Sequence, residues 1–176
     1  QIGDGGTSGS IIGDITNNAA LAFNRSDDVT FADDISGNGS LEKLGAGTTT
    51  LTGTNSFSGG TTIDAGTLQI GEGGTSGSIA GDITNNAALV FNRSDALTFG
   101  GQISGTGSFH KLGAGTTTLT GANSFTGGTT IGAGTLQIGD GGTSGSIIGD
   151  IANNAALAFN RSDALTFGGQ ISGTGS

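Results

Sequence analysis

The sequence predicts an all-β fold, a parallel β-solenoid in which short strands stack coil upon coil along a rod. Three observations support this prediction: an internal repeat that restarts at Gln69 and Gln137, short runs of alternating apolar residues, and glycine-rich turns between them. The stretch Gln1–Ser10 returns from Gln69 with Glu72 in place of Asp4, and it returns unaltered from Gln137. A chain this repetitive builds its core by stacking like units on like units.

The repeat divides the chain into units 1–68 and 69–136 and a partial unit 137–176, which we interpret as one continuous solenoid. The first two units are about four-fifths identical. Stacked units leave little room for a unique pocket made from distant segments, so an elongated structural or binding surface is expected. No signal peptide and no initiating Met open the chain, and the third unit is incomplete, so we expect a segment of a longer protein.

The composition excludes several classes of function. The 176 residues include 38 Gly and no Pro, Cys, Met, Trp or Tyr, so disulfides and thiolate metal sites are excluded. The net charge of −9 opposes binding to nucleic acid and to anionic membranes, because both require Lys and Arg to neutralise phosphate. No apolar run is long enough to span a membrane, and no motif indicates a cofactor.

Each unit contains short runs in which every second residue is apolar, which predicts strands with one buried face. The expected strands of the first unit are 21–23, 29–31, 49–52, 61–63 and 68–70. Turn-forming residues separate them at 17–18, 37–39, 54–56 and 59–60. No stretch has a helical period, and the glycine density opposes helix.

The spacing of similar runs predicts the size of one coil. Runs 47–51, 66–70 and 88–92 begin about 20 residues apart, a spacing typical of the shortest solenoid repeats. The interval to the next unit is longer, so we expect three coils per unit, the third with an excursion at 33–43. At about 4.8 Å per coil, one unit advances by about 14 Å and the whole rod measures roughly 35–40 Å.

Three coils per unit also predict ladders of identical residues inside the rod, since each residue would return to the same line every third coil. The predicted ladders are Ile15, Ile83 and Ile151; Phe23, Phe91 and Phe159; and Leu21, Leu89 and Leu157. Corner glycines permit positive φ angles, and corner Asn side chains are expected to form ladders between coils.

Two segments, 44–71 and 112–139, resemble the autotransporter-associated β-strand repeat. They share its Gly-x-Gly opening, followed by Leu-x-Gly, Asn-x-aromatic, Gly-Gly-Thr-Thr and Ala-Gly-Thr-Leu. The residues that carry the resemblance are Gly45, Gly47, Leu51, Gly53, Asn55, Phe57, Gly59, Gly60, Gly66 and Leu68, with their copies Gly113, Gly115, Leu119, Gly121, Asn123, Phe125, Gly127, Gly128, Gly134 and Leu136. Thr49 and Thr117 depart from the family, which usually has a buried Leu there, so a wetter or narrower corner is expected.

The resemblance implies a right-handed parallel β-helix from the passenger of a Gram-negative surface protein secreted by the type V route. It implies an extracellular location at the cell surface, with anchoring in the outer membrane through a translocator barrel elsewhere in the protein. The implied partners are ligands on host or neighbouring cells. The family repeat has no catalytic residues to transfer, so the resemblance carries over a scaffold and not an activity.

An acidic cluster is the main candidate site. Asp27, Asp28, Asp33 and Asp34 flank the expected strand 29–31. Such carboxylates could serve acid/base cleavage of polysaccharides or bind calcium. The second unit has Ala96, Gly101 and Gln102 in place of the last three, so the cluster is dispensable to the fold. We therefore favour a solvated acidic face and no metal or catalytic site.

The remaining candidates are also interpreted as surface features. His110 replaces Glu42 and is expected to be exposed, whereas Arg25 and Asp27 are expected to form a surface pair that repeats every third coil. Asn38 and the recurring Asn24, Asn92 and Asn160 lie in glycosylation sequons, with or without a glycan. A flat threonine array of the ice-binding kind is interrupted by residues such as Gln69.

Three functions remain open from the sequence. The preferred one is a rod-like stalk or adhesin segment of a cell-surface autotransporter, with a structural and not an enzymatic role. The second is a self-associating extracellular filament or biofilm matrix protein that pairs through solenoid ends or flanks. The third, an enzyme on a β-helix, requires catalysis by Asp33 and Asp34.

Overall fold

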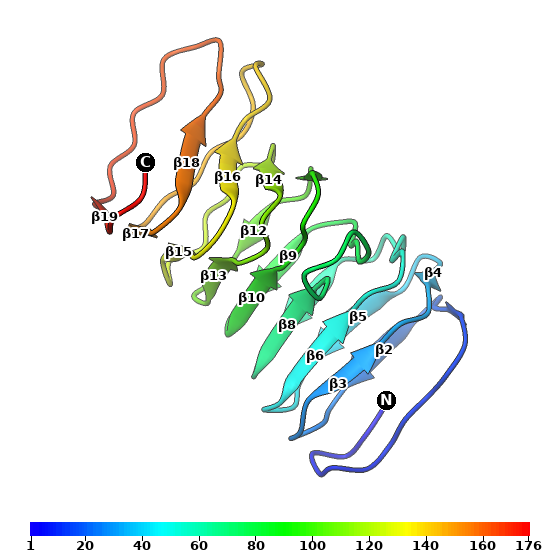
Figure 1. Cartoon of the computed structure of the whole chain (residues 1–176). Coiled ribbons are helices and arrows are strands. Elements are labelled where there is room, and N and C mark those ends of the chain that lie inside the picture. The colour runs from blue at the N-terminus through cyan, green and yellow to red at the C-terminus, as the bar shows by residue number, and fades with distance from the viewer.

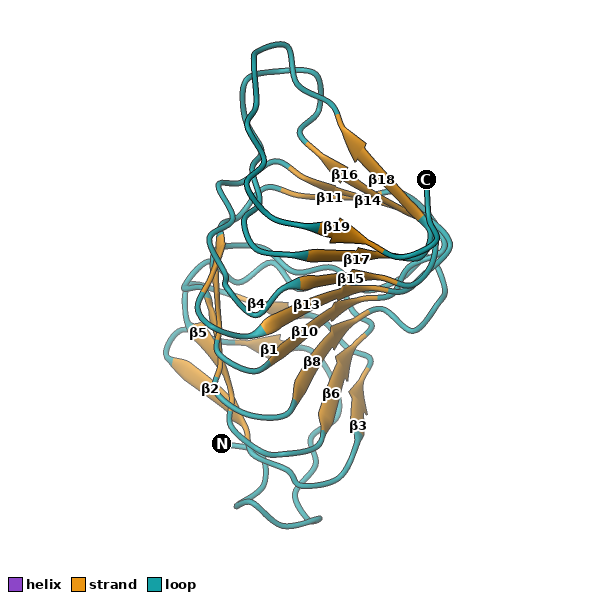
Figure 2. Ribbon diagram, turned by 90° about the vertical axis from the view of Figure 1, so that its left-hand side faces the viewer, coloured by secondary structure: helices purple, strands orange, loops and turns teal.

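The computed structural model describes residues 1–176 and contains strands but no helix (Figure 1). Its 19 strands pair in parallel and form a solenoid of about 8 turns. The predicted fold class, an all-β parallel solenoid, is therefore confirmed. Figure 2 shows strands of one face stacked in order along the rod, with longer loops at the corners between faces.

The strands belong to four parallel sheets of eight, five, four and two strands. The eight-stranded sheet contains β3 (Val29–Phe31), β6 (Thr48–Leu51), β8 (Thr67–Ile70), β10 (Ala88–Phe91), β13 (Ser108–Lys111), β15 (Thr129–Ile131), β17 (Ile151–Asn153) and β19 (Ile171–Ser172). The five-stranded sheet contains β2 (Ala20–Phe23), β5 (Ser40–Lys43), β7 (Thr61–Ile63), β9 (Ile83–Asn85) and β12 (Ile103–Ser104). The other two contain β11 (Leu97–Phe99), β14 (Thr116–Leu119), β16 (Thr135–Ile138) and β18 (Ala156–Phe159), and β1 (Ile15–Thr16) with β4 (Ile35–Ser36).

The register of these pairs gives the length of one coil. In the eight-stranded sheet, seven register steps carry Val29 to Ile171. Averaged over these steps, one coil takes about 20 residues, which is also the separation of Asp14 from its partner Asp34 in the next coil. This length agrees with the spacing of the runs in the sequence. A unit then contains about three and a third coils, not three.

The predicted ladders of identical residues are wrong for this reason. Phe23, Phe91 and Phe159 lie in the five-, eight- and four-stranded sheets, on β2, β10 and β18. Leu21, Leu89 and Leu157 lie on the same three strands and are separated in the same way. Ile15, Ile83 and Ile151 lie in the two-, five- and eight-stranded sheets, on β1, β9 and β17.

Counting the segments of a unit explains the extra third of a coil. Between the start of β1 and the start of its copy β9, the chain contains the eight strands β1 to β8 and two further segments. These two segments pair through an isolated bridge between Thr54 and Ser78. The rod has three faces: the eight-stranded sheet forms one, the five-stranded sheet lies on the second, and β1 and β4, the two bridged segments and the four-stranded sheet follow one another on the third. Ten segments placed on three faces fill three coils and one face of a fourth. Each unit therefore begins one face further round the rod than the unit before it.

All three faces follow one order of segments. The four strands β11, β14, β16 and β18 are the copies of β3, β6, β8 and β10, which open the eight-stranded sheet. The strands of the five-stranded sheet correspond, one unit earlier, to the last five strands of the eight-stranded sheet, β10, β13, β15, β17 and β19. In the same way, β1 and β4 correspond to the last two strands of the five-stranded sheet, β9 and β12. A given segment therefore meets the same two types of neighbour on every face.

The excursion predicted at 33–43 is also wrong. That stretch contains β4 and β5, and both pair in regular register with the coils on either side. The longer loop is 71–77, between β8 and the bridge residue Ser78. Gly71, Gly73 and Gly77 adopt positive φ angles there, which turn the chain outward and back again.

The core is one continuous column of 24 buried apolar residues. Phe109 packs edge-on against Phe91, with ring centroids 5.4 Å apart, and it also contacts Phe125 at 6.0 Å. The threonines that depart from the family, Thr49 and Thr117, are each 1% exposed. The expectation of a wetter corner is therefore wrong, because both side chains are shielded from solvent.

Two lysines lie inside the rod with no exposed surface. Lys43 pairs across the sheet with Phe23 and Ile63, and its Nζ donates to the carbonyl oxygens of Gly45 and Ala65. Lys111 repeats this arrangement, donating to Gly113 and Ala133. Burial lowers the pKa of both lysines, because the interior solvates an ammonium group poorly.

The buried lysines predict that stability increases at alkaline pH. A lysine whose pKa is lower in the folded chain destabilises folding while it is charged, and this effect fades as the pH rises through the folded pKa towards the ordinary value of 10.5. The chain contains no Tyr or Cys, so no other side chain titrates in this range. Urea unfolding followed by circular dichroism is expected to give a free energy of unfolding that rises as the pH increases towards 10.5, the ordinary pKa of lysine.

A double variant, Lys43→Met and Lys111→Met, is the control for this prediction. It leaves an unbranched apolar side chain, one heavy atom shorter than lysine, at both positions and removes both titrating groups, so its free energy of unfolding should lose the alkaline rise. An equal rise in the double variant would contradict the assignment. Asp28 opposes the shift at Lys43, whereas Ala96 stands at the equivalent place near Lys111. Lys111→Met alone should therefore remove the larger share.

Candidate functional surface

The outward-facing positions of the strands carry small and mostly uncharged residues. In the eight-stranded sheet they form one row, paired in register from coil to coil. The row consists of Thr30, Thr50, Gln69, Val90, His110, Thr130, Ala152 and Ser172. Thr50 lies beside Gln69, so the threonine array is interrupted as the sequence indicated. This face of the rod is therefore a mostly uncharged strip, in which Thr50 and Val90 are buried and the other members are partly or fully exposed.

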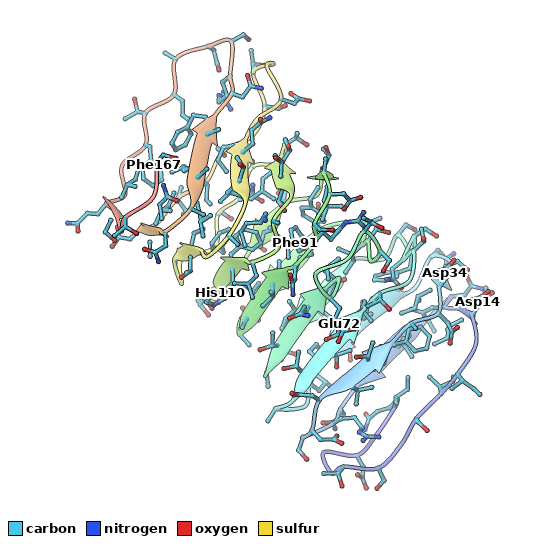
Figure 3. The ribbon with its side chains drawn as sticks, in the orientation of Figure 1. Asp14, Asp34, Glu72, Phe91, His110 and Phe167 are labelled. Carbon is cyan, nitrogen blue, oxygen red and sulfur yellow. The ribbon has the colours of Figure 1, made fainter.

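Five aspartates lie where one coil passes the next, and their carboxylates accept backbone hydrogen bonds from the following coil: Asp14, Asp28, Asp34, Asp82 and Asp150. Asp14 Oδ1 accepts from the amide of Asp34 at 3.0 Å, and Asp34 Oδ1 accepts from the amide of Thr54 at 2.6 Å. Figure 3 shows Asp14 and Asp34 side by side at the edge of the rod. Asp82 and Asp150 repeat the contact with the amides of Gln102 and Gln170. These carboxylates bind successive coils together, which a purely solvated acidic face would not do.

The four candidate carboxylates each have a separate partner. Asp27 pairs with Arg25, Asp28 accepts from the amide of Thr48, and Asp33 accepts from the amide of Gly13. Asp34 caps Thr54, as described above. No group of three or more His, Asp or Glu side chains in the chain is placed to hold a metal ion. The arrangement supports a structural use of these carboxylates.

A loop held by an arginine projects from the rod in each unit. We call these segments, residues 3–9, 71–77 and 139–145, the docked loops. In the second unit Arg93 donates to both carboxylate oxygens of Asp95, at 2.8 and 2.7 Å, and to the carbonyl oxygen of Gly77 at 2.5 Å. The loop backbone adds hydrogen bonds from Gly73 to Asn92 and from Ser94 to Gly74.

The same contacts recur in the other units. Arg25 pairs with Asp27 and donates to Gly9, and Arg161 pairs with Asp163 and donates to Gly145. The expected surface pair of Arg25 and Asp27 is therefore present. The prediction that these pairs stack in one line, one every third coil, is wrong, because the three arginines follow β2, β10 and β18 on different faces. The sequence reasoning missed the contact to the loop, which joins residues 16 apart.

The arginine lowers the pKa of the aspartate in each pair, mainly through their hydrogen bonds. A carboxylate whose folded pKa lies below its ordinary value of 3.8 stabilises the folded loop above that value. The contribution is lost as the pH falls through the lowered pKa. The docked loops should thus stay in place at neutral pH and loosen only in strong acid.

Replacing Arg93 by Met is expected to release the second docked loop while the rod stays folded. The variant loses the paired carboxylate contact and the hydrogen bond to Gly77, but no core residue changes. Hydrogen exchange should accelerate at the amides of Gly73 and Ser94, which close the loop. Exchange in the third-unit loop, held by Arg161, provides the internal control. Unchanged exchange at Gly73 would show that the arginine does not hold the loop.

The residues of the resemblance occupy the inside and the corners of the coils. Leu51, Phe57 and Leu68 are fully buried, as are Leu119, Phe125 and Leu136 in the second copy. Asn123 lies inside a corner, where its Nδ2 donates to Gly121 and Ser146 and its Oδ1 accepts from the amide of Ile103. Gly66 and Gly134 adopt φ angles of 66° and 65°. The remaining members lie where one coil touches the next: Gly45, Gly47, Gly53, Asn55, Gly59, Gly60, Gly113, Gly115, Gly121, Gly127 and Gly128.

The remaining candidates lie on strands or beside the docked loops. His110 is on β13, not in a loop, and its Nε2 lies 3.0 Å from the hydroxyl of Ser108. Figure 3 shows it on the outside of the rod, beside β13. Asn24 and Asn92 directly follow β2 and β10 and are partly buried next to the docked loops. No helix in the structure has the length and apolar character needed to cross a membrane.

Comparison with known proteins identifies the matched segments. The family model of the passenger-associated transport repeat matches residues 41–70 and 109–138. The chain is also 42% identical over 162 residues to the Adhesin BmaC autotransporter of Brucella suis biovar 1 (strain 1330). This alignment covers 80% of the chain and 5% of that much longer protein. No solved structure gives a significant match.

The two matched segments begin on β5 and β13 and end on β8 and β16, at equivalent places in successive units. The residues between them form β9 to β12, which pair in the same sheets as the matched strands. The intervening stretch is therefore part of the same solenoid and not a separate spacer. Residues 41–70 and 109–138 are passenger-associated transport repeats, and the chain carries an autotransporter passenger repeat.

Proposed function

We propose that the chain is a stalk segment of a cell-surface autotransporter adhesin, extending the protein from the cell and contributing contact surface along its flanks. The similarity to the Adhesin BmaC autotransporter is the observation that carries this proposal. A rod whose core is continuous across unit boundaries supports the mechanical role. Separate partners for the four candidate carboxylates favour a structural role over an enzymatic one.

The stalk role is tested by changing the number of units. A variant in which residues 69–136 are duplicated should lengthen the rod by about 16 Å, at about 4.8 Å per coil, without changing its cross-section. Small-angle X-ray scattering measures both dimensions. Growth in cross-section instead of length would contradict the stalk. Length that grows with protein concentration would favour the alternative, a self-associating filament.

The adhesive role is tested with beads coated with the purified chain. We expect coated beads to bind cultured epithelial cells more than albumin-coated beads do, and soluble chain should compete with them. A variant with Gly113→Ala and Gly115→Ala is the control, because it disrupts the contact between coils while keeping almost the same composition. Equal binding by the folded chain and by albumin would reject adhesion by this segment. The measurement of rod length would be unaffected.

A further inference from the structure

The mismatch between units and coils turns each unit relative to the previous one. Ten segments on three faces leave every unit one face further round the rod, and equivalent strands show this directly. Thr16, Thr84 and Ala152 occupy the same outward position in successive units and lie on β1, β9 and β17. These strands belong to the two-, five- and eight-stranded sheets. Corresponding surface groups therefore point in three different directions.

The turn is the same at every unit boundary, because the pairing of segments is the same. The strand pairs that join one unit to the next have the same register at both unit boundaries. Thr67 pairs with Ala88, and the equivalent Thr135 pairs with the equivalent Ala156. The pairing of Thr61 with Ile83 is repeated in the same way further along the chain. No boundary contains an extra or a missing residue that would compensate for the third of a coil.

We propose that the number of units sets the direction in which the rod presents its surface and whatever follows it. Each added unit advances the rod by about 16 Å and turns it by about a third of a revolution. Three units return a feature to its original side. The docked loops, held by arginines after β2, β10 and β18, consequently face three sides of the rod in turn.

The proposal does not depend on any ligand, so it can fail without affecting the proposed function. A change of unit number by recombination between near-identical units would alter both reach and direction. One or two extra units would move a distal contact surface to another side, whereas three would change the reach alone. This is a property of the segment count, since a unit of nine or twelve segments would add length without rotation.

Distances between spin labels test the turn in the chain as it exists. The chain has no cysteine, so Thr16→Cys, Thr84→Cys and Ala152→Cys can be introduced in pairs without a competing thiol. All three positions are on the outward side of strands, and circular dichroism checks that the variants fold. Double electron–electron resonance then gives the three distances between the labels.

The expected distances do not lie on a line. Thr16 to Thr84 and Thr84 to Ala152 should be equal, and both should exceed the axial advance of about 16 Å. The distance from Thr16 to Ala152 should be clearly shorter than the sum of the other two. Additive distances would place the three labels on one side of the rod and overturn the proposal.

A second chain gives an independent check. Duplicating residues 69–136 places the first and last labels three units apart instead of two. They should then lie on the same side, separated by about 48 Å of axial advance alone. The control is a chain in which the inserted copy of residues 69–136 lacks one of its ten segments. That copy then has nine segments, so it should add length without any turn. A three-unit separation well above the axial value would also reject the proposal.

Discussion

Replacing Phe109 by Ala is expected to lower the free energy of unfolding by about 3–5 kcal/mol, through lost apolar burial and the cavity left behind. The ring has no exposed surface and contacts Phe91 in the coil before it and Phe125 nearby. Because a solenoid can close such a cavity only by moving neighbouring coils, relaxation should be limited. Urea unfolding followed by circular dichroism measures the loss.

The chain provides the matched control for this prediction. Leu41 occupies the equivalent position in the first unit and is also fully buried. Phe109→Leu should therefore cost clearly less than Phe109→Ala, because Leu fills most of the volume that the ring occupies. Phe159→Ala is a second comparison, since that ring is 41% exposed at the end of the rod and should matter much less. Similar losses for all three variants would contradict a packed aromatic column.

Replacing Gly115 by Ala is expected to destabilise the rod by about 3 kcal/mol, because the added methyl group overpacks the contact between two coils. A Cβ atom at this position would lie 1.9 Å from the carbonyl oxygen of Asp95 in the preceding coil. That atom is backbone and cannot swing away, so the coils would have to separate. The reduced midpoint of urea unfolding reports the effect.

Gly74 is the control for Gly115. It lies in a docked loop with no atom within 4 Å of the added Cβ, and its φ angle is not positive. Gly74→Ala should be neutral or stabilise the chain by up to about 1 kcal/mol, because it restricts the unfolded state. If both substitutions had the same effect, close approach between coils would not be the reason for Gly115.

The sequence alone predicted the solenoid and the strands in which apolar and polar residues alternate. The strand β5 was missed because Glu42 and Lys43 resemble an exposed loop. Its pattern nevertheless matches β2, with Leu41 and Lys43 in the places of Leu21 and Phe23. That comparison would have placed the lysine side chain inside the rod. The loop contact of Arg25 had no comparable pattern, because it depends on the path of the docked loop.

The period of the sequence alone could not show which residues stack on one another along the rod. A period gives the repeat along the chain, whereas the position around the rod depends on how many coils fit into it. The runs of apolar residues are compatible both with coils of the observed length and with slightly longer coils. Only the longer coils would give a whole number of three coils per unit, whereas the observed length gives about three and a third. The corner carboxylates were predictable in part, since Asp14 and Asp34 are one coil apart in the sequence.

The short register steps, such as those from Thr116 to Thr135 and from Thr129 to Ile151, also govern how the chain folds. Each coil needs only its neighbour as a template. Every step therefore closes a loop of about 20 residues, and no step has to close a longer loop at a larger entropy cost. Contacts stay local in the chain, which favours faster folding than in most β proteins of similar length. Order should spread from any formed coil towards both ends, and the end coils should be the first to open.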